Sequence, residues 1–168
     1  MSYEKTVWAG EGTLAREQEY NDHWCYERGI ITKAWLDVYA ATGDRRFYDA
    51  AKANVDQYVT ADGEILTYEP DKYNLDMICM GRTALRLFKA TGEAKYEKAC
   101  RRLIEQIKGQ PTTAEGGFWH KKLYPQQMWL DGIYMACPFL TEFAVTFGEM
   151  QWADLAAKQM NLIFAKTR

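Results

Sequence analysis

The chain has 168 residues, of which 48% are hydrophobic and 26% are charged, a composition typical of one globular domain. Its net charge of −2 gives no electrostatic basis for binding nucleic acid or an anionic membrane surface. Charged side chains interrupt residues 1–20 throughout, so we predict no signal peptide and no transmembrane segment, and we expect a cytoplasmic protein.

A short pattern occurs three times along the chain: a glycine, then an acid, then an aromatic residue four positions after the glycine. The glycines are Gly43, Gly92 and Gly148, and the aromatic residues are Phe47, Tyr96 and Trp152. Glycine can take the left-handed conformation that ends a helix, and the acid lies where the dipole of the next helix favours it. The repeat therefore predicts three helical hairpins.

The predicted helices differ in character within each hairpin. The first members, at 25–42, 74–91 and 127–147, are apolar almost all round, whereas the second members, at 45–59, 94–108 and 150–166, have a polar face. This asymmetry predicts an inner and an outer layer of helices. We therefore predict an all-α fold of the α/α toroid type, with functional residues in the longer connections between hairpins.

The four cysteines do not form a metal-binding pattern. Cys25, Cys79, Cys100 and Cys137 are far apart in the sequence, and each lies in a helix-like apolar stretch. We expect buried, reduced thiols and no metal ion.

Asp131 is the main candidate for chemistry. It lies inside the apolar stretch "YPQQMWLDGIYM", where an acid would be substantially desolvated and its pKa raised. A carboxyl group that is still protonated near neutral pH suits a general acid, and the adjacent Gly132 leaves room for a ligand. The alternative is a structural aspartate that is buried and hydrogen-bonded to a neighbouring helix.

Asp76 and His120 are the next candidates. Asp76 is predicted in the first turn of the second inner helix, so it could enter the same cleft as Asp131 and share acid–base work. Its alternative role is to interact with the helix dipole. His120, in "GGFWHKK", is predicted in a shaped loop at the mouth of the cleft, although a solvated loop histidine is the alternative.

Several aromatic residues could stack on a sugar ring, although core packing is the alternative for each of them. The candidates are Trp24, Tyr26, Tyr124 and Trp129.

The stretch "GGFWHKKLYPQQMWLDGIYMACPFL" resembles the unsaturated rhamnogalacturonyl hydrolases of glycoside hydrolase family 105, which are related to the unsaturated glucuronyl hydrolases of family 88. The stretches "WCYERGIITKAW" and "YNLDMI" are similar to that family too. The chain departs from the family pattern at Cys79, Met80 and Cys137.

The resemblance implies a fold, an activity and roles for residues. The fold would be an (α/α)6 toroid, and the activity would remove a 4,5-unsaturated uronic acid from the non-reducing end of pectin-derived oligosaccharides by hydrating its double bond. Asp131 would be the general acid and base, Asp76 the second carboxylate, and His120 a substrate-binding residue. The resemblance implies no metal and no organic cofactor.

Three hairpins are half of a six-hairpin toroid, so residues 1–168 are predicted to be one partial domain, with residues 1–21 as an N-terminal extension. A half barrel exposes the flanks of apolar helices, and a homodimer could cover them. The alternative to an enzyme is a non-catalytic helical-repeat module that binds a saccharide or a protein partner.

Overall fold

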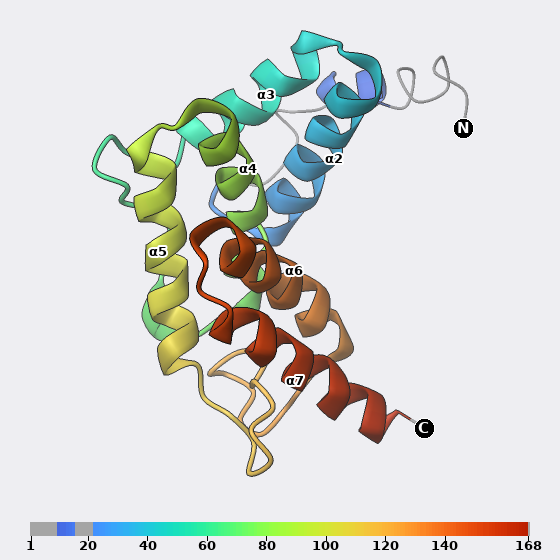
Figure 1. The fold of residues 1–168 in the computed structure, drawn as a ribbon, viewed down its shortest axis with the longest axis vertical. Coiled ribbons are helices and arrows are strands. Elements are labelled where there is room, and N and C mark those ends of the chain that lie inside the picture. The colour runs from blue at the N-terminus through green and yellow to red at the C-terminus, as the bar shows by residue number, and fades with distance from the viewer. Residues whose placement is uncertain (1–9, 16–21, 168) are drawn as a thin grey trace.

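The computed structural model describes residues 10–15 and 22–167, and the described chain is built from α-helical hairpins (Figure 1). The first hairpin is α2 (Tyr26–Thr42) and α3 (Arg45–Asp56). The second is α4 (Gly81–Thr91) and α5 (Ala94–Gly109), and the third is α6 (Leu130–Phe147) and α7 (Gln151–Lys166). Two short 3-10 helices, η2 (Pro70–Lys72) and η3 (Leu75–Ile78), precede α4.

The predicted hairpin turns are confirmed. Gly43, Gly92 and Gly148 end α2, α4 and α6 with φ angles of 73°, 69° and 72°, and their N–H groups bond to carbonyls of the preceding turn. The aromatic residues that follow are buried at the hairpin contacts. The repeat thus sets both the end of one helix and the packing of the next.

The helix predicted at 45–59 ends at Asp56, and two further boundaries differ from the prediction. The element predicted at 74–91 is divided into η3 and α4, because the chain turns at Cys79 and Met80. The helix predicted from residue 127 begins only at Leu130, because residues 126–129 belong to an irregular connection. Both differences lie beside the candidate site residues, and both place those residues near helix starts.

The inner layer is α2, α4 and α6, with α4 between the other two (Figure 1). Thr32 of α2 and Thr83 of α4 share a buried hydrogen bond of 2.8 Å. The core is filled mainly by large apolar side chains, among them Trp35, Phe139 and Phe143. All four cysteines lie in the described part and are buried free thiols, as predicted, and burial raises the pKa of Cys79 and Cys137 to about 11.

One flank of α6 is exposed, as predicted for a half barrel. Leu130, Tyr134 and Val145 of this helix are 66%, 43% and 69% exposed. They lie on a helix that has α4 on one flank and no further inner helix of the described chain on the other. None of the described helices is long and apolar enough to cross a lipid bilayer.

Residues 10–14 are helical, and they belong to the segment predicted as an N-terminal extension. Thr13 Oγ1 accepts a hydrogen bond of 2.7 Å from Trp35 Nε1, and Leu14 packs against the core. The remaining parts of that segment, residues 1–9 and 16–21, lie outside the described residues.

Gly29 permits the closest approach between α2 and the turn before α4. A Cβ atom at this position would lie 2.8 Å from Met80 N and 3.0 Å from Cys79 C, which are backbone atoms that cannot move independently. We expect Gly29→Ala to lower the free energy of unfolding by about 1–3 kcal/mol, measured by urea denaturation.

Gly12→Ala is the matched control, because a Cβ there has no atom within 4 Å. It should leave stability unchanged or raise it slightly. Equal stability of the two variants would contradict the close packing of α2 on the turn.

Candidate active site

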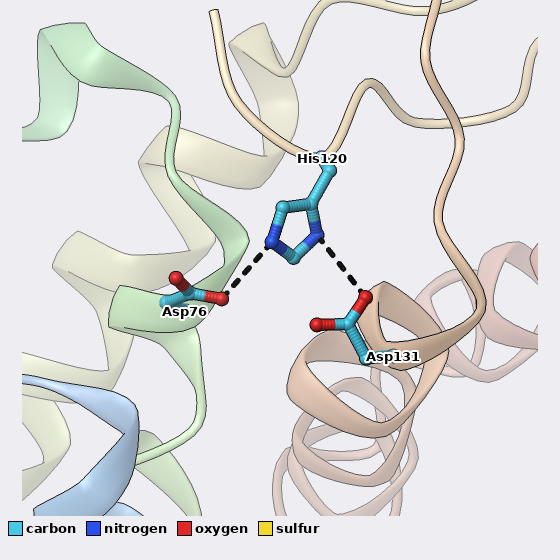
Figure 2. Close-up of side chains that lie close together, drawn as sticks. All are labelled: Asp76, His120 and Asp131. Carbon is cyan, nitrogen blue, oxygen red and sulfur yellow. Dashed lines mark ion pairs between the residues drawn. The ribbon is translucent and has the colours of Figure 1, made fainter. Parts of the chain in front are cut away.

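Three acidic and basic side chains from distant parts of the sequence meet in one cluster (Figure 2). Asp76 comes from η3, His120 from the connection between α5 and α6, and Asp131 from the first turn of α6. His120 Nε2 lies 3.1 Å from Asp76 Oδ1, and His120 Nδ1 lies 3.9 Å from Asp131 Oδ1. The imidazole therefore stands between two carboxylates.

Local hydrogen bonds explain why these segments meet. Asn74 caps η3, because its side-chain oxygen accepts a 3.0 Å hydrogen bond from Asp76 N. The peptide groups of Leu75 and His120 are joined, since Leu75 N donates to His120 O at 3.0 Å. His120 N in turn donates to Gln127 O at 2.8 Å, so the connection folds back on itself just before α6 begins.

Asp76 is a buried carboxylate that has two cationic or polar partners. Its side chain is 13% exposed, and the ammonium group of Lys121 lies 2.6 Å from Oδ2. Burial works to raise the pKa of Asp76, but hydrogen bonds from His120 and Lys121 outweigh it and hold the pKa below its usual range. The charged form of Asp76 is thus stabilised by its two partners, whereas its predicted alternative role concerned only a helix dipole.

The predicted desolvation of Asp131 is wrong for the chain as described. Its side chain is 53% exposed, because α6 starts at Leu130 and leaves Asp131 in an open first turn rather than in the middle of a helix. The structural alternative, an acid buried against a neighbouring helix, is wrong for the same reason. Asp131 is the member of the cluster that faces solvent.

His120 is not a solvated loop residue, since its side chain is 1% exposed. Its ring stacks on Trp129 with a centroid separation of 4.5 Å and an interplanar angle of 8°. Its Nδ1 atom has no hydrogen-bond partner among the described residues. The ring is held by Asp76 at one nitrogen and offers the other nitrogen toward Asp131.

Gly132 leaves space for His120 rather than for a ligand. A Cβ atom at Gly132 would lie 3.1 Å from His120 Nδ1 and 3.2 Å from Leu75 Cδ1. The glycine predicted to admit a substrate therefore admits the imidazole of His120 instead.

The predicted stacking residues separate into two groups. Trp129 and Tyr124 lie beside the cluster, where their rings stack at 4.9 Å and Trp129 is 37% exposed. Tyr26, the first residue of α2, is half-buried; its pKa is raised chiefly by a hydrogen bond with Glu27, and the charge of Asp76 adds to the effect. Tyr26 is therefore near enough to interact electrostatically with the site.

Trp24 does not offer a stacking surface. Its side chain has 0% exposure, and its Nε1 donates a 2.7 Å hydrogen bond to Met77 O. The prediction that Trp24 binds sugar is wrong for this chain, because the indole is part of the core that supports η3.

Two contacts at the candidate site could not be predicted from the sequence. Lys121 pairs with Asp76, but nothing in "WHKK" distinguishes it from Lys122. Gln110, which follows α5, donates hydrogen bonds of 2.8 Å to both Tyr73 O and Trp119 O. A lone glutamine after a helix carries no sequence signal for such a role.

The donor atoms of Asp76, His120 and Asp131 lie within 4.8 Å of one another, a spacing that could hold a metal ion. The ammonium group of Lys121 already bonds to Asp76, and its positive charge would repel a cation at that place. The arrangement favours proton transfer, and the absence of a metal remains a prediction.

The charge of Asp76 should make its contribution to stability depend on pH. Its pKa in the folded protein lies below the usual 3.8, so this contribution is fully present above that value and is lost as the pH falls through the folded value. We expect Asp76→Asn to lower the free energy of unfolding by about 1–3 kcal/mol at neutral pH, with the difference narrowing below about pH 4.

Urea denaturation over a range of pH measures this effect. Asp154→Asn, which changes an exposed acid in the first turn of α7, is the control and should shift the free energy of unfolding by less than about 0.5 kcal/mol. A difference between Asp76→Asn and the unchanged protein that did not vary with pH would count against the proposed charge pairing.

The similarities to known proteins agree with the geometry of the cluster. A family model described as Glycosyl Hydrolase Family 88 matches residues 5–168. A solved glycoside hydrolase from family 105 of C. acetobutylicum is 34% identical, superposes with a TM-score of 0.86, and is matched over 96% of this chain and 44% of its own. The chain therefore spans less than half the length of that relative.

Two further solved structures support the fold. Each is described as a possible member of family 105, one from Klebsiella pneumoniae (21% identity, TM-score 0.71) and one from Salmonella enterica serovar Paratyphi A (18% identity, TM-score 0.67). Each is matched over 83% of this chain and 36% of its own. The all-α fold predicted from the repeat, as part of an (α/α)6 toroid, is confirmed.

Proposed function

Because the chain belongs to glycosyl hydrolase family 88, we propose that it carries the acid–base residues of a glycosidase acting on unsaturated uronyl oligosaccharides. The proposed reaction removes a 4,5-unsaturated uronic acid from the non-reducing end of a pectin-derived oligosaccharide. The observation that supports it most is the cluster of Asp76, His120 and Asp131, in which one carboxylate is exposed and the other two groups are buried behind it.

Asp131 is the proposed general acid and base. Its exposure makes it the carboxyl group of the cluster that a sugar can reach. In the proposed step it gives a proton to C4 of the double bond, and a water molecule deprotonated by the same carboxylate adds at C5. The hemiketal formed in this way opens and releases the next sugar. Proton transfer by a positioned carboxyl group is general acid–base catalysis.

Asp76 and His120 support this carboxylate in the proposed site. The 3.1 Å contact with Asp76 fixes the imidazole by its Nε2 atom, so Nδ1 points toward Asp131. Trp129 and Tyr124 form an aromatic surface next to the same cluster and are the proposed contacts for a sugar ring. The roles assigned to these residues, the lack of a cofactor and the cytoplasmic location all remain predictions.

The proposed activity is tested with an unsaturated pectin disaccharide. Hydration destroys its conjugated enol ether, so the ultraviolet absorbance of that group should fall with time. Asp131→Asn removes the acid and should slow this loss by at least about a hundredfold.

Asp154→Asn is the matched control, because Asp154 is also an acid in the first turn of a helix, the outer helix α7. It should leave the rate unchanged. Turnover that survives in Asp131→Asn would contradict the assigned acid. Binding heat in calorimetry without any loss of absorbance would favour the alternative, a non-catalytic saccharide-binding module.

An apolar groove lies on α6 and α7, and it bears on the oligomeric state of the protein. The groove has a volume of about 500 Å³ and is lined by Leu130, Ile133, Tyr134, Cys137, Pro138 and Met160, with Thr141 and Glu142. It begins one residue from Asp131. Exposed apolar surface of this kind is characteristic of an interface.

We propose that a second copy of the chain covers this groove, as the predicted homodimer requires. The matched solved relative contains more than twice the chain that is matched here. A closed two-fold arrangement would bury the flank of α6 in both copies.

The mass of the particle in solution tests this arrangement. We expect a dimer by light scattering, and we expect Leu130→Glu to shift it toward a monomer because a charge would be buried at the contact. Leu123→Glu is the control, since Leu123 is 75% exposed and outside the groove. A monomer at all concentrations would contradict the homodimer.

A further inference from the structure

The two segments that hold Asp76 and His120 are not parts of a long helix or of a sheet. Asp76 lies in the short helix η3, and His120 lies in the irregular connection between α5 and α6. A 3.1 Å contact between two such segments requires something to hold their backbones at a fixed distance. The direct backbone bond between Leu75 and His120 is one support. The side chain of Gln110 is a second.

Gln110 lies at the point where α5 ends, and it is 6% exposed. Its Nε2 group donates to Tyr73 O and to Trp119 O, each at 2.8 Å. Tyr73 comes just before the cap of η3, and Trp119 comes directly before His120. One primary amide therefore uses both of its N–H groups to join the two segments that meet at the site.

Gln106 fixes the orientation of the Gln110 amide. Gln106 Nε2 donates to Gln110 Oε1 at 3.1 Å and to Asn74 O at 3.2 Å, and Gln106 Oε1 accepts from the hydroxyl group of Tyr68 at 2.8 Å. Because Gln110 Oε1 is engaged by a donor, its Nε2 must face the two carbonyl groups. Each side-chain amide nitrogen and oxygen of Gln106 and Gln110 therefore has a hydrogen-bond partner.

The backbone of Tyr73 is strained, and the hydrogen bond from Gln110 helps to hold it in this conformation. Tyr73 has φ 45° and ψ 46°, a left-handed conformation that is uncommon for a residue with a side chain. Such a conformation persists where the surroundings hold it. Its carbonyl oxygen is one of the two that Gln110 binds.

We propose that Gln110 is a positioning residue that sets the distance between Asp76 and His120 by holding the carbonyl groups of Tyr73 and Trp119. Its importance for turnover rests on the proposed function, but the positioning itself does not. The effect should therefore be visible in the imidazole of His120, whether or not the chain is active.

The test observes the Nε2 proton of His120 by NMR in the full chain. The sequence has two histidines, so His23→Gln leaves His120 as the single imidazole. A proton between Nε2 and the Asp76 carboxylate, in a ring that is 1% exposed, should exchange slowly with water. Gln110→Met is nearly isosteric but has no donor, and it should make this exchange about tenfold faster or more.

Gln159→Met is the matched control. Gln159 is also a fully buried glutamine that binds the same connection, since it accepts from Phe118 N at 2.8 Å and donates to Gly116 O at 3.0 Å. It does not bond to Tyr73 or Trp119, so its loss should leave the exchange of the His120 proton within about twofold of the unchanged protein.

Two results would overturn the proposal: unchanged exchange in Gln110→Met, or equally fast exchange in Gln159→Met. If Gln110→Met does not fold, Gln110→Asn keeps the amide but withdraws it by one methylene group, and it should speed the exchange to a smaller extent. Normal exchange in Gln110→Asn would then reject the proposal. A failure to turn over the disaccharide, with fast exchange in the Gln110 variant, would reject the proposed function alone.

Discussion

The charge of a buried carboxylate determines how this end of the molecule is arranged. Asp76 is almost fully removed from water, and an isolated charge in that position would be strongly unfavourable. Its partners are two consecutive residues of the connection between α5 and α6, His120 and Lys121. The long connection therefore has to fold over η3, and the site forms where the two segments meet (Figure 2).

The helical scaffold could be predicted from the sequence because its determinants are local. The glycines at 43, 92 and 148 end helices through their own backbone conformation, and the aromatic residues that follow pack within the same hairpin. The break between η3 and α4 was not predictable in this way. At this break the Met80 backbone lies closely against Gly29 of another helix, a contact between distant segments that local patterns do not express.

The residues of the candidate site could be predicted from the sequence, but their exposure and their contacts could not. Asp76, His120 and Asp131 were identified from their motifs, and they do lie together. The exposure of Asp131 was predicted wrongly, because the apolar residues around it in sequence suggested burial that the open turn of α6 does not supply. Lys121 and Gln110 act through contacts with distant segments, which no spacing within the sequence expresses.

The pairing of Lys121 with Asp76 also determines which side chains set the net charge of the cluster. These two groups cancel each other, so the net charge of the cluster depends only on Asp131 and His120. An anionic ligand that approaches this end of the helices therefore meets a buried carboxylate whose charge Lys121 offsets, with Asp131 as the exposed acid beside it.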